Sequence, residues 1–357
     1  MDSKILSVIV PSYNMEAYLP KCLGSLIIND KDLLRKLDVI VVNDGSKDHT
    51  SVIAHDFEAK YPGVFRVIDK ENGHYGSCIN AALPGALGKY VKILDADDSV
   101  DTPEFEKLLQ VIAEECSKHA ACADLIVSDY VTVDPEGKVL SKSNLGLMED
   151  MSTLREQKDW GGRLTIHAIC YRTHNLHRIE YRQSEGVPYT DVEWYIEPMI
   201  TVKRMRYVPI VATRYLIGRD GQTIDAKIFA KNFQVILDLT ERLVERYEGN
   251  ASKCEEFALD YYRKQIMNML HLCYRCGLFG FGKEKVRVNL HQFDAHLAHF
   301  PLFYQETGLF SCGPNHFRFR YVAFFRKYGF GLIWKLRSLL NTCLLETAKV
   351  ILRSNRH

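Results

Sequence analysis

Short apolar runs alternate with helical patterns through the first part of the chain. Runs with the length and β-branched content of buried strands cover residues 6–10, 39–42, 64–68, 90–94 and 125–128. Residues 15–28 and 75–87 have the apolar spacing of helices, and the last strand is expected to extend into a hairpin around residues 134–137. Continuous apolar strands that alternate with helices are typical of a parallel sheet covered on both faces. The pattern therefore predicts an α/β fold.

The pattern changes near residue 227. Apolar positions repeat at helical spacing in residues 228–247, 255–276 and 283–299, which predicts a helical appendage. From residue 316 onward the chain is rich in aromatic and basic residues, and Glu346 is its only acidic residue. We therefore expect three parts: an α/β domain at 1–225, a helical appendage at 226–310 and a basic amphipathic segment at 311–357.

Composition narrows the class of protein without identifying its chemistry. The 357 residues have a formal net charge of +1, so no overall attraction to nucleic acid is expected. No window approaches the roughly 18 uncharged apolar residues that a membrane-spanning helix needs. The ten cysteines are scattered, and the Cys273-x-x-Cys276 pair has no second pair to complete a zinc site. Free thiols and the lack of a charged-then-apolar leader lead us to expect a cytoplasmic protein.

The apolar run at 90–94 ends in three carboxylates, Asp95, Asp97 and Asp98. Hard divalent cations take oxygen ligands and share them with substrate phosphates, so this strand end is a natural seat for a metal–diphosphate pair. The alternative is a solvated acidic turn before a helix that starts near Thr102. Ligands bind parallel sheets beyond the carboxyl ends of the strands. That rule gathers on one rim residues 11–14, Asp44, residues 72–76 and residues 95–98.

Six motifs follow one another between residues 5 and 225. They are VIVPSYN at 8–14, VVNDGS at 41–46, ENGHYGS at 71–77, LDADD at 94–98, YTDVEW at 189–194 and RDGQT at 219–223. In this order and spacing they resemble the motifs of the family 2 glycosyltransferases, which are inverting enzymes. The resemblance implies a GT-A nucleotide-diphospho-sugar transferase fold, with a Rossmann-like, mostly parallel sheet. The C-terminal helical appendage lies outside the shared core.

The resemblance also implies a nucleotide site. Asp44 would accept a hydrogen bond from an imide N–H such as that of uracil, although an Asp before Gly45 is also an ordinary turn residue. Tyr13 would stack on the base, and Gly73 would allow the backbone to approach the ligand closely. The full set of nucleotide-binding candidates is Pro11, Ser12, Tyr13, Asn14, Asp44, Asn72, Gly73, Gly76, Asp95 and Ala96.

The motifs at 94–98 and 189–194 imply which residues bind the metal and which residue acts as the base. Asp97 would bind Mn²⁺ or Mg²⁺ directly, and Asp95 would hold the ribose or the metal through water. Asp191 lies where the family carries its catalytic carboxylate and would take the acceptor hydroxyl proton as general base. Its alternative role is to cap the helix that follows. Glu193 is the alternative base.

Four further residues are candidates for the phosphate or sugar side. Arg219 and Gln222 would donate to the diphosphate, or belong to a polar loop. His167 would contact a sugar, or be a hydrogen-bonded core histidine. Trp194 would stack on a sugar face, or pack in the core.

Two positions depart from the family pattern. Family members often have Ser-x-Ala-Arg-Asn after the glycine loop, whereas residues 77–80 of this chain are Ser-Cys-Ile-Asn, without the arginine. The catalytic motif is commonly Glu-Asp, and here Thr190 replaces the Glu. Asp191 is retained, so the change at Thr190 affects the expected orientation of the base and not its identity.

These features predict an inverting hexosyl- or N-acetylhexosaminyltransferase that moves a sugar from a UDP-sugar to an acceptor hydroxyl on a surface glycan or lipid-linked glycan. The alternatives are a nucleotidyltransferase that makes a nucleotide-sugar and a degenerate sugar-binding module. A nucleotidyltransferase usually needs a glycine-rich phosphate loop near the first strand, where this chain has residues 11–14, Pro-Ser-Tyr-Asn.

The C-terminal segment suggests a location. Residues 330–353 place apolar side chains largely on one helical face and polar or basic ones mostly on the other. A basic amphipathic stretch suits an anionic membrane surface, which predicts peripheral binding at the inner face of the cell membrane. The alternative is a helix that packs on the catalytic domain or on a second subunit in a homodimer.

Overall fold

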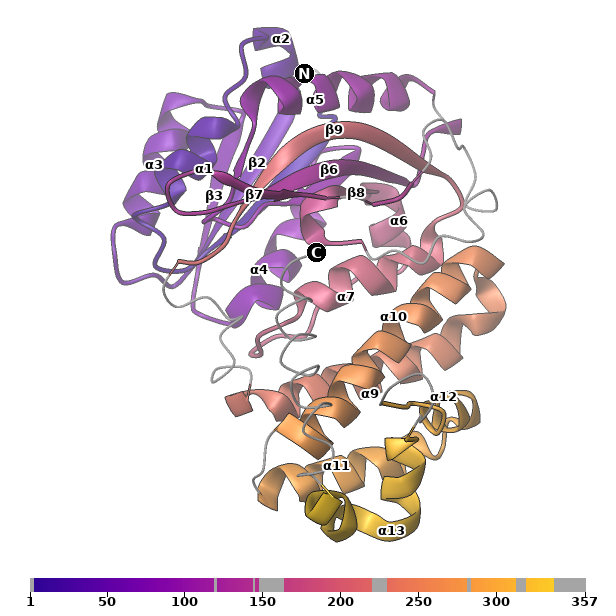
Figure 1. The fold of residues 1–357 in the computed structure, drawn as a ribbon. Helices are drawn as coiled ribbons and strands as arrows, with labels where there is room; N and C mark the ends of the chain where they lie inside the picture. Colours follow the sequence, from indigo (N-terminus) through magenta and orange to yellow (C-terminus); the bar gives the residue numbers. More distant parts are fainter. Residues whose placement is uncertain are drawn as a thin grey trace. The chain divides into compact units, whose positions relative to one another are not determined.

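The computed structural model describes residues 3–118, 121–143, 145–147, 164–219, 230–280, 284–312 and 319–336 (Figure 1). The chain divides into two compact units. Unit 1 comprises Met1–Asp220 and Cys254–Leu259, and unit 2 comprises Gly221–Lys253 and Asp260–His357.

Within the described residues of unit 1, nine strands form one sheet. They are β1 (Leu6–Ser12), β2 (Leu37–Asp44), β3 (Phe65–Lys70), β4 (Tyr90–Ile93), β5 (Ser99–Val100), β6 (Leu125–Val133), β7 (Val139–Lys142), β8 (Ile169–Arg172) and β9 (Met205–Leu216). The strand order is β3-β2-β1-β4-β8-β6-β9-β5, and β7 pairs with β6.

The sheet is parallel where the sequence predicts it and mixed elsewhere. β1 pairs in parallel with β2 and β4, and β2 pairs in parallel with β3. All eight residues of β2 are buried, both the apolar run at 39–42 that the sequence predicts and the polar Asp38, Asn43 and Asp44. β8 runs antiparallel to both β4 and β6, so a strand that the sequence analysis missed joins the two halves. The predicted hairpin is confirmed: β6 and β7 pair antiparallel around residues 134–137.

Helices cover both faces of this sheet (Figure 1). They are α1 (Leu19–Ser25), α2 (Lys31–Leu34), α3 (Thr50–Lys60), α4 (His74–Ala82), α5 (Thr102–Ser117), α6 (Thr173–Arg178) and α7 (Asp191–Ile196). Alternate residues of β1, such as Val8 and Val10, belong to one buried cluster with Leu23 of α1 and Leu108 of α5. Figure 1 shows α4 and α7 on the opposite side of the sheet from α5.

The helix predicted at residues 15–28 begins later than expected. α1 starts at Leu19, because Met15 instead donates its backbone N–H to the Thr50 hydroxyl at 2.7 Å. Pro20 in the first turn suits a helix start, since its missing N–H would have no partner there. The chain between β1 and α1 therefore remains a loop on the rim of the sheet.

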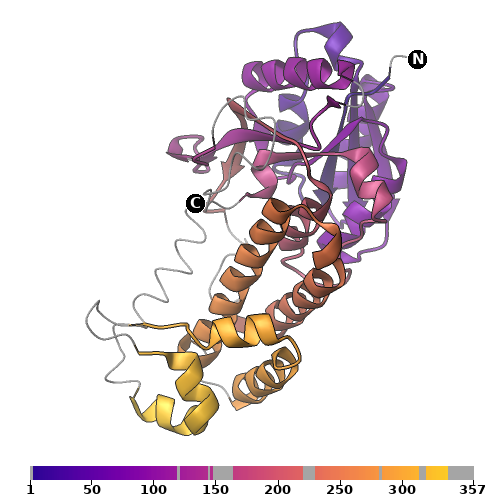
Figure 2. The same ribbon diagram turned by 90° about the vertical axis from the view of Figure 1, so that its right-hand side faces the viewer.

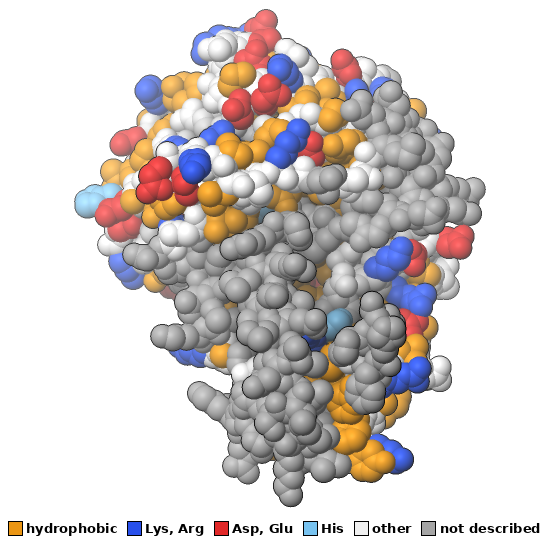
Figure 3. Space-filling model, in the orientation of Figure 1, with side chains coloured by type: hydrophobic (Ala, Val, Ile, Leu, Met, Phe, Trp, Pro, Cys, Tyr) orange, Lys and Arg blue, Asp and Glu red, His pale blue; other side chains and the backbone are white. Residues whose placement is uncertain are grey.

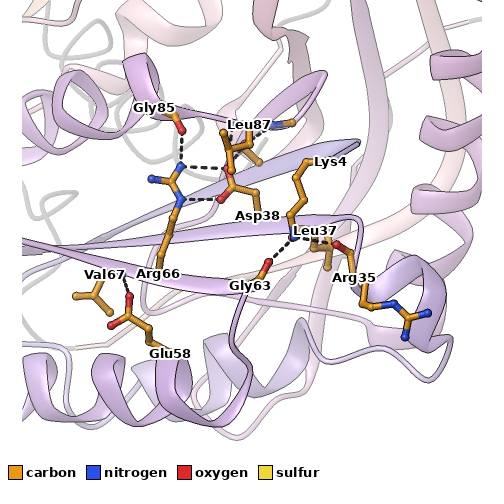
Figure 4. Close-up of polar contacts among 12 residues, drawn as sticks. Lys4, Arg35, Leu37, Asp38, Glu58, Gly63, Arg66, Val67, Gly85 and Leu87 are labelled. Carbon is orange, nitrogen blue, oxygen red and sulfur yellow. Dashed lines mark hydrogen bonds and ion pairs between the residues drawn. The ribbon is translucent and has the colours of Figure 1, made fainter. Parts of the chain in front are cut away.

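An ion pair between a buried aspartate and a half-buried arginine lies on the sheet away from this rim (Figure 4). Arg66 donates from Nε and Nη2 to the two carboxylate oxygens of Asp38, at 2.7 and 3.1 Å. Ser7 and the Leu87 N–H donate to the same carboxylate at 2.6 and 3.0 Å. Although burial opposes ionisation, these hydrogen bonds hold the pKa of Asp38 below its ordinary value. The pair ties β1, β2 and β3 together and has no part in the site described below.

Unit 2 is helical in its described residues (Figure 2). The helices are α9 (Phe233–Asn250), α10 (Glu256–Arg275), α11 (Glu284–Leu297), α12 (Pro301–Thr307) and α13 (Tyr321–Leu336), with a π-helical turn at Cys276–Gly280. The three helices predicted here correspond to α9, α10 and α11. The Thr240 hydroxyl lies 3.4 Å from the Cys273 thiol, which joins α9 to α10.

Arg326 ties the later helices of unit 2 together. Its guanidinium donates to Asp294 of α11 at 2.9 Å and to the Tyr304 carbonyl of α12 at 2.7 Å, and it stacks over the Tyr304 ring. α13 is kinked at Gly329, where φ is 71°. Residues 337–357 lie outside the described residues, and with them most of the predicted amphipathic segment.

No helix in the described part of the chain is long and apolar enough to cross a membrane. On the face of unit 1 seen in Figure 3, basic and acidic side chains are intermingled. This mixture agrees with the near-zero net charge.

Candidate functional site

The loops after β1 and β2 are fastened to each other at the carboxyl-end rim. The Asn14 backbone N–H donates to the Ser46 hydroxyl at 3.0 Å, and the Asn14 side-chain oxygen accepts from the Lys47 N–H at 2.8 Å. Asn14 has a left-handed backbone, with φ of 52°, a conformation that asparagine tolerates better than most residues. Asn14 therefore shapes the loop that presents Tyr13, whose side chain is 45% exposed.

Asp44 lies at the end of β2, where its carboxylate organises the glycine loop. Its Oδ1 accepts from Lys70 Nζ at 2.8 Å and from the Gly73 N–H at 3.0 Å. Asn72 donates to the Asp44 carbonyl at 3.0 Å. The structure thus brings Asp44, Asn72 and Gly73 together, as the sequence predicts, and adds Lys70 as a cation that the sequence analysis missed.

Four of the nucleotide candidates have a structural role in the fold. Gly76 is required by protein packing, because a Cβ there would lie 2.0 Å from the Ser184 carbonyl oxygen. Ser12 is buried and donates its hydroxyl to the Val10 carbonyl at 3.2 Å. Ala96 is buried in the core of the sheet. Pro11 pairs with Val42 inside β1 and does not end the strand.

The acidic cluster follows β4 directly. Asp95 Oδ1 accepts from the half-buried Tyr75 hydroxyl of α4 at 2.9 Å. Desolvation, followed by the like charges of Asp98 and Asp97, raises the pKa of Asp95 to about 8. The same two effects, burial and then the charge of Asp97, raise the pKa of Asp98. A bound cation would reverse both effects, because it favours the ionised carboxylates.

Asp97 forms an ion pair with an arginine. Its carboxylate contacts Nε of Arg219, just beyond β9, and both side chains are largely buried. The Arg219 guanidinium also lies 5.5 Å from the centre of the Tyr18 ring. The predicted phosphate-side arginine and metal-side aspartate are thus adjacent. Gln222 lies outside the described residues.

The donor chemistry of this cluster fits a divalent cation. Mg²⁺ is commonly held by one or two carboxylates plus phosphates and water, and Asp95 and Asp97 can supply these two carboxylates. Among the described residues, no group of three or more His, Cys, Asp or Glu side chains is arranged to hold a metal by itself. A cation at Asp97 would therefore share its ligands with substrate, and would compete with Arg219 for the carboxylate.

His167 belongs to a buried layer beneath the cluster. Its Nδ1 lies 3.2 Å from Asp98 Oδ2, and its ring stacks on Tyr215 with the ring centres 4.0 Å apart. Its carbonyl accepts from Lys92 Nζ at 2.6 Å. Burial lowers the pKa of His167 to about 4 and also lowers the pKa of Lys92. His167 is therefore a core histidine that supports Asp98, and the expected sugar contact is corrected.

Asp191 is the first residue of α7, where it borders the acidic cluster. Its charge acts on the pKa of Tyr75, His167 and Tyr215, so it lies within electrostatic range of all three side chains. Tyr189, just before the helix, has a left-handed backbone with φ of 67°. The structure therefore brings the candidate base to the same region as Asp95.

The other two candidates on α7 are buried. Trp194 is fully buried and packs edge-on against Tyr171 and Tyr181, with ring centres 5.5 Å apart in each pair. The core role is therefore the correct one, and stacking on a sugar is not. Glu193 is also fully buried, and its two carboxylate oxygens accept from the Ser184 N–H and hydroxyl at 2.7 and 2.9 Å.

Comparison with known proteins places this site in a family. Residues 7–151 match the model described as "Glycosyl transferase family 2". An uncharacterized glycosyltransferase of Mycoplasma pneumoniae, the MG060 homolog, is 26% identical over 67% of this chain and 77% of its own length. EpsJ of Bacillus subtilis, also an uncharacterized glycosyltransferase, is 36% identical over 30% of each chain. The minor teichoic acid biosynthesis protein GgaB of B. subtilis is 38% identical over 30% of this chain and 12% of its own.

The solved structures agree on the fold. TarS 1–349 from S. aureus superposes with a TM-score of 0.64 at 18% identity, over 99% of this chain and 91% of the other. Its complex with UDP-GlcNAc superposes with a TM-score of 0.58 at 19% identity, over 85% and 91%. The family match over residues 7–151, the relatives named as glycosyltransferases and this likeness therefore agree on a family 2 glycosyltransferase domain in a chain with a GT-A fold.

Proposed function

We propose that this glycosyltransferase moves a sugar from a UDP-sugar to an acceptor hydroxyl, with inversion at the anomeric carbon and with Mn²⁺ or Mg²⁺ bound. The observation that carries the proposal is the position of three carboxylates. Asp95 and Asp97 follow β4, and Asp191 is the first residue of α7. The Tyr75 hydroxyl donates a hydrogen bond to Asp95, and the charge of Asp191 acts on Tyr75. In this proposal, the carboxylates that bind the diphosphate through a cation and the carboxylate that activates the acceptor belong to the same site.

Each group has a task in this proposal. Asp44 and the Gly73 loop hold the base, and Tyr13 has the exposure to stack on it. Asp97, with Asp95, would hold the cation, which supplies Lewis-acid stabilisation of the diphosphate leaving group. Arg219 donates to the same phosphates once Asp97 binds the cation. Asp191 takes the proton from the acceptor hydroxyl as that oxygen attacks the anomeric carbon.

The acceptor is proposed from the relatives. GgaB is named for minor teichoic acid biosynthesis, and TarS was solved with UDP-GlcNAc and with UDP. These names support a bacterial surface-glycan acceptor and a UDP-hexose or UDP-N-acetylhexosamine donor. The matched part is only 12% of GgaB, so the acceptor belongs to the proposal and not to the family assignment.

Turnover of radiolabelled nucleotide-sugars tests the proposal. The protein is incubated with Mn²⁺ and with UDP-, GDP- and dTDP-sugars in separate reactions, and released nucleotide and the anomeric configuration of any product are measured. We expect turnover of a UDP-sugar and an inverted product. Turnover of GDP- or dTDP-sugars alone, or a retained configuration, would contradict the donor or the mechanism.

We also propose a cytoplasmic location at the inner face of the membrane, through residues 330–353. In the described part that precedes them, Tyr328 is half exposed and Lys327 lies over its ring at 4.9 Å. Such aromatic and basic pairs suit an anionic interface. Cosedimentation with anionic vesicles should retain the full chain and release a chain truncated at Phe330. Equal behaviour of the two would favour a helix packed on protein or a homodimer.

A further inference from the structure

Residues 183–186 bridge the nucleotide loop and the helix that carries Asp191. We name these residues the strap. It lies between α4, which begins just after Gly73, and α7, and it makes hydrogen bonds to residues on both sides. Neither the family motifs nor the proposed chemistry assigns it a task.

On the α4 side, Asn80 clamps the strap. Asn80 Nδ2 donates to the Gln183 carbonyl at 2.9 Å, and Asn80 Oδ1 accepts from the Gln183 N–H at 2.9 Å. The Gly186 N–H donates to the Gly73 carbonyl at 2.9 Å. The Ser184 carbonyl packs so closely that a Cβ on Gly76 would lie 2.0 Å from it. Asn80 thus holds the backbone of the strap from the α4 side.

On the α7 side, Glu193 holds the strap. Its carboxylate accepts from the Ser184 N–H at 2.7 Å and from the Ser184 hydroxyl at 2.9 Å. A fully buried carboxylate is costly unless hydrogen-bonded, so these two contacts are needed for it to stay where it is. Asp191 lies two residues earlier on the same six-residue helix. A shift of Glu193 would therefore shift Asp191.

The contacts form a continuous chain across the site. The Asp44 carboxylate accepts from the Gly73 N–H at 3.0 Å, and the Gly73 carbonyl accepts from the strap. The strap then reaches Glu193 through Ser184. Between strap and helix, Tyr189 has a left-handed backbone that costs free energy and persists only when neighbours enforce it.

We propose that Glu193, through Ser184 and the Asn80-clamped strap, is a positioning residue that sets Asp191 relative to the bound donor nucleotide. The proposal rests on the proposed role of Asp191 as base. Glu193 does not itself take the proton, because both its oxygens are buried and bonded to Ser184. This role fits the departure at Thr190, where the family commonly has Glu. In this chain the carboxylate of Glu193, two residues after Asp191, holds the start of α7 in its place.

Glu193→Gln is the direct test, because its NH₂ group would face one of the two Ser184 donors. We expect kcat with a UDP-sugar to fall about ten- to a hundredfold, the scale of a roughly 1 Å misplacement, while calorimetric affinity for UDP stays within about twofold. The acidic limb of the pH–rate profile should remain, because Asp191 is still present. Adding Ser184→Ala should cost little more, since both changes remove one contact.

Glu115→Gln is the matched control. Glu115 is also a buried carboxylate that accepts a backbone N–H, from Ala123 at 3.0 Å, but it lies on α5. It should lower Tm without lowering kcat, which separates positioning from general destabilisation. Hydrogen exchange supplies a readout without turnover: amides of residues 191–196 should exchange faster in Glu193→Gln than in the control or the wild type.

Two results would overturn the proposal. One is a Glu193→Gln variant with wild-type kcat and wild-type exchange in α7. The other is loss of the acidic limb in that variant, which would make Glu193 the base. Failure of the proposed function would look different: the wild type would turn over no UDP-sugar, and hydrogen exchange alone would then decide whether the strap holds α7.

Discussion

At the scale of the residue, the proposed chemistry depends most on Asp191. Asp191→Asn removes the proton acceptor and keeps the size of the side chain. We expect kcat to fall about a hundredfold or more, the usual scale for losing a general base, with UDP affinity retained. Steady-state turnover and UDP calorimetry on the same preparation measure both.

Two outcomes of that experiment would change the assignment. Near-normal transfer would remove the base role from Asp191. Loss of UDP binding together with a lower Tm would show a structural role at the start of α7, where a carboxylate is favourable in any case.

Sequence reasoning located the carboxylates better than the other candidates. Asp44, Asp95 and Asp97 lie at the ends of apolar strands, and a strand end is visible in the sequence. For His167 and Trp194 the sequence left both a sugar contact and a core position open, because nothing in one sequence tells whether an aromatic side chain faces a ligand or the core. Their burial depends on packing against residues far along the chain, such as Tyr215 and Tyr181.

At the scale of the element, Gly88 fixes the approach of the chain to β1. A Cβ on Gly88 would lie 2.2 Å from the Ser7 backbone nitrogen and 2.4 Å from the Leu6 carbonyl carbon. Gly88→Ala should therefore lower the free energy of unfolding by about 3 kcal/mol, because backbone atoms would have to move. Urea unfolding measures this change.

Gly24 provides the control on a helix. A Cβ on Gly24 in α1 meets no atom within 4 Å, so Gly24→Ala should raise the free energy of unfolding by about 0.5–1 kcal/mol. If both variants were equally stable, the close approach at Gly88 would be wrong.

Strands in which apolar residues dominate were mostly predictable, and a strand interrupted several times by polar residues or proline was not. β1, β2, β3, β4 and β6 were all predicted, with boundaries within a few residues. β9 was missed because Arg206, Pro209 and Arg214 interrupt its apolar pattern. Its place in the sheet comes from long-range pairing with β6, which local sequence does not encode.

At the scale of the whole molecule, stability should depend on pH through His271 in unit 2. Its ring stacks on Phe310, and burial, followed by the charge of Arg275, lowers its pKa to about 4. The unfolded chain, with a histidine pKa near 6.5, binds a proton that the folded chain does not. Stability is therefore lost as pH falls from about 6.5 to about 4, by on the order of 2–3 kcal/mol.

His271→Gln measures this contribution. Tm of wild type and variant is recorded from pH 7 to pH 4, and the difference between them should shrink as pH falls. His174→Gln, at an exposed position in unit 1, serves as the control and should keep the wild-type slope. A wild-type slope in His271→Gln would show that its ring is not held neutral.

The central claim is that the carboxylates after β4 bind a nucleotide diphosphate through a divalent cation, and calorimetry with UDP tests it most directly. UDP is titrated into wild type, Asp97→Ala and Asp101→Ala, each with and without Mn²⁺. Asp101 is the control, because it caps α5 close to the cluster in the chain. The account predicts that Mn²⁺ tightens UDP binding about tenfold or more in wild type and Asp101→Ala, and not in Asp97→Ala. Equal Mn²⁺-dependent affinity in Asp97→Ala and wild type would contradict it.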